Sequence, residues 1–319
     1  NVQVDGHTIQ ISKQSAYEEK PLKVSILLHS HVDPGWLETF EEYYTGKVRH
    51  ILDLAVKWLT AEQRLRFIWS ETSFLERWWK DASDEQRSQM KKLVSSGHLE
   101  VCGGAWVMTD EATPHFSASV DNIIEGQRYV DSILSVRPNV SWSVDPFGHG
   151  LMMPSLLPLA GVRRMVVGRL NDMIKAKMRE AMTMRFNWKQ PYSTAGKMSV
   201  EPSFVNTLPY LYYTTRNGCG PQDSVCCKYH VGPSASYCGG TIHQISNVAQ
   251  HAEELLGQYR QVQRLYNTED VLITVGDDFY LTKEGDWKEV VEVYGAIADY
   301  LDKTPSLKAK VFFIRENRG

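Results

Sequence analysis

Apolar strand-like segments alternate with amphipathic helical segments along most of this chain, and this alternation restricts the possible folds more than any other feature. Residues 24–28 form a short, largely apolar segment that is typical of a buried strand. In residues 44–60, apolar side chains recur at steps of three and four, as on one face of a helix. Repeated β-α-β units fold into a mainly parallel sheet that is wrapped by helices. The sequence therefore predicts an α/β fold.

The later segments repeat this pattern. A helix is expected at 83–96, because Asp84 and Glu85 lie in its first turn and Gly97 follows its end. Another helix is expected at 246–266. The remaining strand candidates are 65–69, 99–102, 141–144, 165–167, 271–275 and 311–314. We therefore expect about seven strands in a single α/β domain that comprises residues 1–319.

Residues 172–245 interrupt the alternation, and we expect them to form a loop-rich insertion, since Pro, Gly, Ser, Tyr and Cys are frequent and no period is sustained. Four of the five cysteines lie in this insertion: Cys219, Cys226, Cys227 and Cys238. Two small disulfide loops fit this cluster and indicate an oxidising compartment, whereas adjacent cysteines suit a zinc site poorly. Four reduced, buried thiols are the alternative. The glycosylation sequon Asn139-Val140-Ser141 agrees with the secretory pathway.

The charge of the chain excludes one broad class of partner. A formal net charge of -3 and a pI near 6.4 provide no basic field for phosphate backbones, so no nucleic-acid partner is expected. No apolar run approaches the ~20 residues that span a bilayer, and the first residues lack the order of a signal peptide. Any membrane attachment is expected to use a segment that is not present in this chain.

Three predicted strands end in residues that can bind a metal or transfer a proton. His31 and Asp33 follow the first strand with the two-residue spacing of metal ligands. Asp145 follows the strand 141–144, and Asp277-Asp278 follows the strand 271–275. Ligands bind beyond the carboxyl ends of parallel strands, so these side chains are expected to converge. Alternatively, His31 is a hydrogen-bonded core residue and the aspartates cap turns or helices.

Several aromatic residues lie near these strand ends or in the insertion, where their rings can stack on sugars or pack in the core. They are Trp36, Trp69, Trp106, Phe147, Trp188, Tyr212 and Tyr213. We expect most of them to be core residues and one or two to contact a ligand.

The segment His29-Ser30-His31-Val32-Asp33-Pro34-Gly35-Trp36 resembles the HSHNDPGW motif of the class II α-mannosidases, glycoside hydrolase family 38, and differs only at Val32. The similarity covers most of the chain, and the cysteine pattern is similar to that of the Golgi branch. It continues through Arg49 to Asp53, Phe67 to Glu71, Gly104 to Met108, Asp110 to Ala112, Asp145 to His149, Cys219 to Pro221 and Gly276 to Phe279.

The resemblance implies specific roles for residues at the strand ends. One Zn²⁺ ion per chain would be held by His31, Asp33 and Asp145, with Asp145 also the nucleophile and Asp278 the acid/base. The implied substrate-binding residues are Trp36, Phe147, Arg169, Tyr213 and Asp277. The implied disulfides join Cys219 to Cys226 and Cys227 to Cys238, and leave Cys102 free.

The resemblance also implies the fold and the activity. We expect an irregular seven-stranded parallel β/α barrel that carries a retaining, zinc-dependent α-mannosidase. Such an enzyme hydrolyses α1,3- and α1,6-linked mannose of N-glycans in the Golgi lumen, and its parent protein is expected to be membrane-anchored.

Two departures from the family pattern keep other functions open. The family's fourth zinc ligand, a histidine, and the C-terminal helical and β-rich domains are expected beyond Gly319. Thr214 stands where the Golgi enzymes carry an aspartate, and Leu170-Asn171-Asp172 does not match the usual His-Tyr pair. The alternatives are a non-catalytic glycan-binding barrel and a metal-dependent carbohydrate deacetylase.

Overall fold

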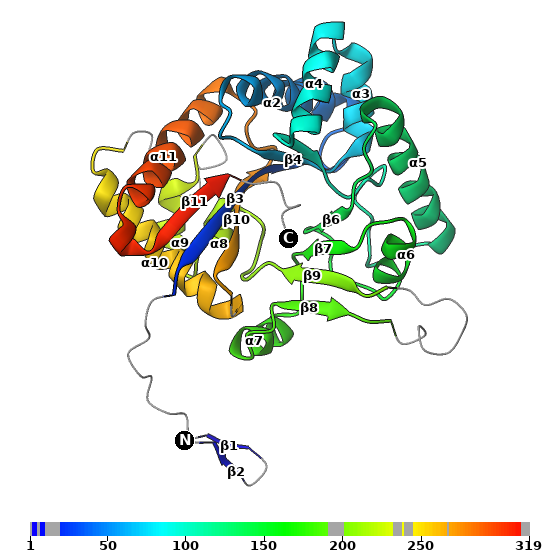
Figure 1. Cartoon of the computed structure of the whole chain (residues 1–319). Coiled ribbons are helices and arrows are strands. Elements are labelled where there is room, and N and C mark those ends of the chain that lie inside the picture. The colour runs from blue at the N-terminus through cyan, green and yellow to red at the C-terminus, as the bar shows by residue number, and fades with distance from the viewer. Residues whose placement is uncertain are drawn as a thin grey trace.

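The computed structural model describes residues 20–190, 201–231, 238, 245–266 and 268–313, and the backbone of 2–4 and 7–9. Its strands are β1 (Val2–Val4), β2 (His7–Ile9), β3 (Leu22–His31), β4 (Phe67–Trp69), β5 (Leu99–Val101), β6 (Val140–Ser143), β7 (Arg164–Val167), β8 (Arg185–Trp188), β9 (Ser203–Thr207), β10 (Asp270–Asp278) and β11 (Ala309–Phe313). The predicted α/β class is confirmed, because helices connect most of these strands (Figure 1).

The helices are α1 (Phe40–Tyr43), the π-helical turn η1 (Tyr44–Val48), α2 (Arg49–Ala61), α3 (Thr72–Asp81), α4 (Asp84–Ser96), α5 (Phe116–Leu134), α6 (Met153–Leu159), α7 (Asp172–Glu180), α8 (Thr215–Gly218), α9 (Asp223–Cys226), the 3₁₀ turns η2 (Cys227–Tyr229) and η4 (Pro305–Leu307), α10 (Val248–Tyr266) and α11 (Glu284–Asp302). The predicted helix at 83–96 is present as α4, which begins with a capping box at Ser83 and ends at Gly97 in the left-handed conformation. None of the described helices combines the length and the hydropathy needed to cross a bilayer.

The strands form two main sheets rather than one continuous sheet. In the first, the order is β10-β3-β4-β5, and β11 also pairs with β3; every pair is parallel. In the second, the order is β6-β7-β9-β8, and only β8 is antiparallel. One backbone hydrogen bond, from Gly103 N to Val140 O at 2.6 Å, links the end of β5 to β6. A closed seven-stranded barrel is therefore not confirmed by the described residues.

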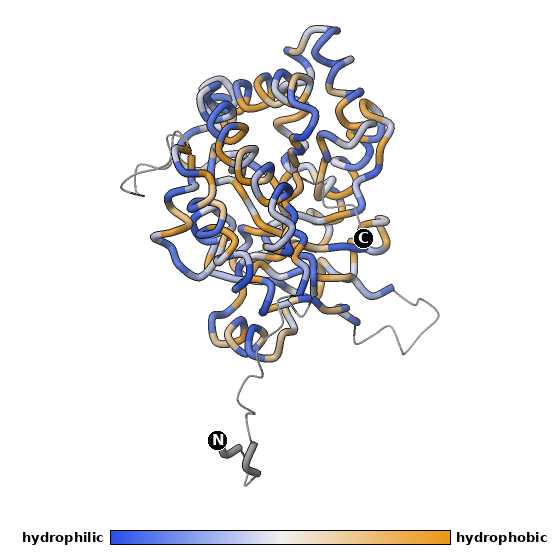
Figure 2. Tube along the Cα trace, turned by 60° about the vertical axis from the view of Figure 1, so that its left-hand side comes forward, coloured by the Kyte–Doolittle hydropathy of each residue, from blue (hydrophilic) through white to orange (hydrophobic). Residues whose placement is uncertain are grey.

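The two sheets nevertheless enclose one shared apolar layer. Its members come from strands of both sheets and from the segments that follow them: Leu27, Ile68, Cys102, Trp142, Val144, Val166, Leu208, Tyr213 and Leu272. The helices lie outside the strands (Figure 1), and along their length apolar and polar residues alternate, as expected for helices that cover a sheet (Figure 2). In α2, for example, the buried residues are Ile51, Leu52, Ala55, Val56 and Leu59.

The stretch 172–245 contains more regular structure than its composition predicts. It includes α7, β8, β9, α8 and α9, and β9 is an interior strand that pairs with both β7 and β8. Residues 191–200, 232–237 and 239–244 of this stretch, and Ile314 of the last predicted strand, lie outside the described residues. Both implied disulfides, Cys219–Cys226 and Cys227–Cys238, are present, and Cys102 is a buried free thiol.

Candidate active site

The predicted site residues converge at the carboxyl ends of strands from both sheets. In the parallel pair β3–β10, the last residues His31 and Asp278 lie directly opposite each other. Gly276 allows this close pairing, because a Cβ atom there would lie 2.4 Å from the carbonyl oxygen of His29. Asp145 follows β6, in the second sheet, by two residues. The site is therefore built across the junction of the two sheets.

The three implied metal ligands lie close together. The Nε2 atom of His31 is 3.4 Å from Oδ1 of Asp33 and 3.6 Å from Oδ2 of Asp145. One ligand atom from each residue falls within 4.8 Å of the other two. His31 is 4% exposed, and neither of its ring nitrogens has a hydrogen-bond partner among the described residues. A buried imidazole nitrogen that faces two carboxylates without a hydrogen bond to either fits a zinc ion, which takes nitrogen and oxygen ligands.

Asp145 is also held by groups on the side away from His31. Its Oδ1 atom accepts hydrogen bonds from Nε of Arg169 at 3.2 Å and from NH2 of Arg169 at 2.5 Å. The hydroxyl of Tyr212 lies 3.4 Å from the same oxygen and donates to it. Arg169 thus fixes one oxygen of Asp145, while the other oxygen faces His31.

Asp278 is connected to Asp145 through two tyrosines. The hydroxyl of Tyr213 donates to Oδ1 of Asp278 at 2.6 Å, and the hydroxyls of Tyr212 and Tyr213 are 2.7 Å apart. Burial raises the pKa of Asp278 above its ordinary value, and the hydrogen bond from Tyr213 opposes this shift. A buried carboxyl with a raised pKa is suited to carry a proton.

Asp277 points to a different partner. Its Oδ2 atom lies 3.2 Å from Nε2 of His230, which is fully buried, and burial lowers the pKa of His230 to about 4. The two neighbouring aspartates therefore have different surroundings, and Asp278 is the one that is linked to Tyr213. His230 was missed by the sequence reasoning, because no spacing connects it to β10.

Charge is concentrated around the three candidate ligands. Burial disfavours the cationic form of His31, but the carboxylates of Asp33, Asp145 and Asp278 outweigh burial and raise the pKa of His31. Glu71 lies close enough to His31 for their charges to interact, and burial raises the pKa of Glu71 to about 7. One Glu71 oxygen accepts a hydrogen bond from the backbone of Met108 at 3.1 Å. A bound cation would offset this excess of carboxylates.

A second buried carboxylate supports the loop that carries Asp145. Glu111 accepts hydrogen bonds from the hydroxyl of Ser143 at 2.8 Å, from Nδ1 of His149 at 3.1 Å and from the backbone of Gly150 at 3.1 Å. These donors lie on both sides of Asp145 in the sequence, so Glu111 ties the end of β6 to the far end of its loop.

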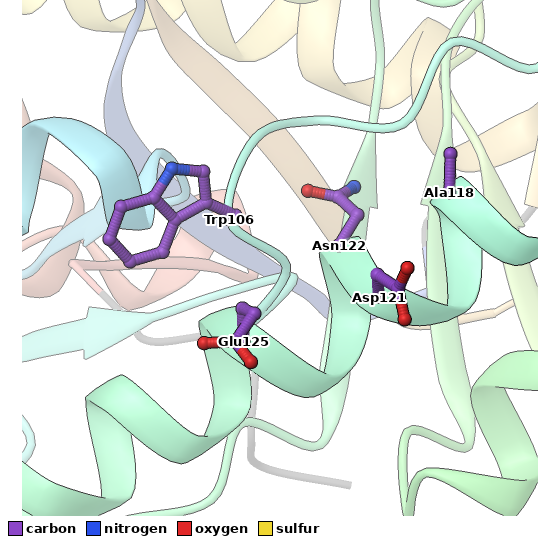
Figure 3. A pocket seen from close by; sticks show the side chains of 5 residues that line it. All are labelled: Trp106, Ala118, Asp121, Asn122 and Glu125. Carbon is purple, nitrogen blue, oxygen red and sulfur yellow. The ribbon is translucent and has the colours of Figure 1, made fainter.

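The predicted aromatic residues differ in exposure. Trp36 is 66% and Phe147 is 75% exposed, and the guanidinium of Arg169 lies 4.8 Å from the Phe147 ring centre and 4.6 Å from that of Tyr212. Trp69 is buried in the core, as expected for most of these rings. Trp106 lines a cavity of about 270 Å³ beside α5, with Ala118, Asp121, Asn122 and Glu125 (Figure 3). None of the site residues lines this cavity.

Thr214 caps a helix in this structure. It is buried, and its hydroxyl accepts a hydrogen bond from the backbone of Asn217 at 3.4 Å at the start of α8. The Thr214 hydroxyl is therefore used to cap α8, directly after Tyr213 in the sequence.

Comparison with known protein families places this chain among the glycoside hydrolases. The family described as "Glycosyl hydrolases family 38 N-terminal domain" matches residues 21–315, so the chain belongs to glycoside hydrolase family 38.

Named relatives agree with this assignment. Alpha-mannosidase 2 of Arabidopsis thaliana is 35% identical over 309 residues, which cover 94% of this chain and 26% of that protein. Alpha-mannosidase 2 of Homo sapiens is 33% identical over 309 residues, which cover 94% of this chain and 27% of that protein. The chain therefore spans about a quarter of the length of these relatives. The crystal structure of an alpha-mannosidase from Enterococcus faecalis has a similar fold, with a TM-score of 0.66, 16% identity and coverage of 93% of this chain and 28% of that one.

Proposed function

We propose that this protein is a retaining, zinc-dependent α-mannosidase. The observation that carries the proposal is the pair of carboxylates at the strand ends: Asp145 shares the candidate metal site, and Asp278 is connected to it through Tyr212 and Tyr213. A retaining glycosidase needs one carboxylate as nucleophile and one carboxyl group as acid/base.

Each carboxyl group is suited to one of these roles. Asp145 is paired with Arg169 and belongs to the candidate metal site, and it would attack the anomeric carbon while the glycosidic bond breaks. Asp278, whose proton is favoured by burial, would donate that proton to the leaving oxygen. In the second step, Asp278 would take a proton from water as the water oxygen displaces Asp145 from the sugar. The product then keeps the starting configuration.

Zinc is the metal that the donor set fits best, with one ion per chain held by His31, Asp33 and Asp145. When bound, zinc supplies a positive centre that attracts sugar hydroxyls and orients the ring. The exposed Trp36 and Phe147 would provide flat apolar surfaces for the sugar. Arg169 lies over the Phe147 ring and Tyr213 is hydrogen-bonded to Asp278, and both are proposed as further substrate contacts.

The substrate class is proposed from the named relatives and the disulfides. Relatives that are called alpha-mannosidase 2 support mannose-containing N-glycans, and we propose α1,3- and α1,6-linked mannose as the residues removed. Two disulfides are consistent with an oxidising compartment, and we propose the Golgi lumen.

Turnover of an aryl α-mannoside, measured with and without a zinc chelator, tests this function. Asp145→Asn and Asp278→Asn are expected to lower kcat by at least ~100-fold. Asp270→Asn is the matched control, because Asp270 lies at the opposite end of β10 and pairs with Lys23 on the surface. The chelator should abolish turnover, and added zinc should restore it. Turnover that resists the chelator would contradict the metal role.

Two further measurements, mannoside binding and acetate release, test the two alternative functions. Mannoside binding without turnover would support a non-catalytic glycan-binding barrel, and acetate release from an acetylated sugar would support a deacetylase. Either result would refute the proposed mannosidase.

A further inference from the structure

A buried amine on α7 joins two backbone segments that carry active-site side chains. Lys175 is 2% exposed, and its Nζ atom donates hydrogen bonds to the carbonyl oxygens of Gly168 and Tyr210, each at 2.6 Å. Gly168 precedes Arg169, and Tyr210 precedes Tyr212 by two residues. We propose that Lys175 is a positioning residue that fixes both segments and thereby sets Arg169 and Tyr212 against Asp145.

The first segment is coupled directly to the strand that carries Asp145. The backbone N–H of Gly168 donates to the carbonyl oxygen of Ser143 at 3.2 Å. A Cβ atom on Gly168 would lie 2.1 Å from the carbonyl oxygen of Val144, so the two backbones touch where no side chain fits. Because Arg169 follows Gly168 and Asp145 follows Val144, a shift of Gly168 would move Arg169 relative to Asp145.

The second segment runs from the end of β9 to the two tyrosines. Lys175 holds it at Tyr210, and Arg179, one turn further along α7, donates to the carbonyl oxygen of Pro209 at 3.0 Å. At its far end, the carbonyl oxygen of Tyr213 is hydrogen-bonded to His29 at 3.0 Å. Figure 1 shows α7 beside the second sheet, so this helix serves as the support on one side of the segment.

The position of the amine argues against an incidental surface contact. Burial lowers the pKa of Lys175 to about 8, with Arg179 adding to the shift and Asp172 opposing it. A buried lysine is disfavoured unless its donors find acceptors, and here two carbonyl oxygens from different segments accept hydrogen bonds from two of its three N–H groups. In turn, the carbonyl oxygens of Gly168 and Tyr210 each accept a hydrogen bond from the amine.

The inference rests on the proposed mannosidase activity, and Lys175→Met tests it. Methionine has a similar shape but no N–H donor. Turnover of an aryl α-mannoside is measured at a temperature where the variant is folded. We expect kcat to fall ~10- to 100-fold and KM to change less than ~3-fold, because misplaced reacting groups slow the chemical step. Zinc affinity is expected to stay within ~3-fold, because His31, Asp33 and Asp145 keep their places. Lys177→Met, at an exposed position of the same helix, is the matched control.

Hydrogen–deuterium exchange provides a readout that does not depend on turnover. Backbone exchange at 168–171 and 209–213 is expected to accelerate in Lys175→Met and to stay unchanged in Lys177→Met. Lys175→Arg keeps N–H donors and should recover most of the lost kcat. Where Lys175→Met does not fold, Lys175→Gln, which can reach a single carbonyl, is expected to show a ~3- to 10-fold loss of kcat.

Three results would overturn the positioning role. The first is a folded Lys175→Met or Lys175→Gln variant that keeps the kcat of the wild type. The second is unchanged hydrogen exchange in both segments of Lys175→Met. The third is a folded Lys175→Arg variant whose kcat is as low as that of Lys175→Met. A wild-type protein without any turnover would instead refute the proposed function, and hydrogen exchange would still decide whether Lys175 fixes the two segments.

Discussion

Replacing Glu111 by glutamine is expected to destabilise the protein, although the two side chains have the same shape. Glu111 is buried and accepts three hydrogen bonds, from Ser143, His149 and Gly150. In one orientation of the amide, its NH₂ group faces the N–H of Gly150, so two donors meet. In the other orientation it faces Ser143 and His149, and His149 must then move its proton to Nε2, which has no partner among the described residues.

Both orientations leave at least one buried donor unpaired and remove the charge from the remaining hydrogen bonds. An unpaired buried donor costs ~1–3 kcal/mol, and hydrogen bonds to charged groups contribute ~1.5–3 kcal/mol each. We therefore expect Glu111→Gln to lower the free energy of unfolding by about 2–3 kcal/mol. Glu111→Ala leaves all three donors unpaired, and we expect a loss of about 4 kcal/mol or more.

Urea unfolding followed by tryptophan fluorescence measures this loss. The control is Glu85→Gln, since Glu85 is exposed on α4 and accepts one hydrogen bond from Gln89. The control is expected to stay within about 0.5 kcal/mol of the wild type. A Glu111→Gln variant as stable as this control would refute the reasoning, because it would show that the three donors are satisfied without the carboxylate.

Three further predictions concern the site and its surroundings. Tyr213→Phe removes the hydrogen bond that lowers the pKa of Asp278, so this pKa should rise and the alkaline limb of the kcat/KM profile should move to higher pH; an unmoved limb would contradict this. Trp36→Ala should raise KM for an aryl α-mannoside ~3- to 10-fold and change the urea midpoint little, since Trp36 is largely exposed; an unchanged KM would count against sugar stacking. Reduction of the two disulfides should lower the free energy of unfolding by about 2–3 kcal/mol each, as compared by urea midpoints; equal midpoints would contradict their stabilising role.

The strands of the first sheet were predictable because their signal is local. Residues 24–28 and 271–275 lie within β3 and β10, where apolar, buried side chains predominate and only Ser25 and Thr274 are polar. By contrast, β9 has the sequence SFVNT, in which polar residues flank only two apolar ones, and the sequence pattern places it in the insertion. Its strand structure depends on pairing with β7 and β8, and such pairing between distant segments leaves no local pattern.

The candidate ligands were predictable for a similar reason. His31, Asp33 and Asp145 each follow an apolar strand, and the carboxyl ends of parallel strands meet at one edge. Their supporting contacts were not predictable, because His230, Lys175 and Glu111 belong to segments whose spatial neighbours only the folded chain defines.

The candidate ligands and the residues that support them belong to different parts of the fold, so one group can change in sequence without the other. His31 is the last residue of β3, and Asp33 and Asp145 lie two residues beyond the ends of β3 and β6, so the strands largely determine where the candidate ligands lie. The supporting residues come from loops and from α7. With the role proposed for Lys175, a change in α7 would adjust Arg169 and Tyr212 while the candidate metal ligands stay the same. Differences in turnover between chains with the same ligand set should thus be sought in these supporting segments before the ligands themselves.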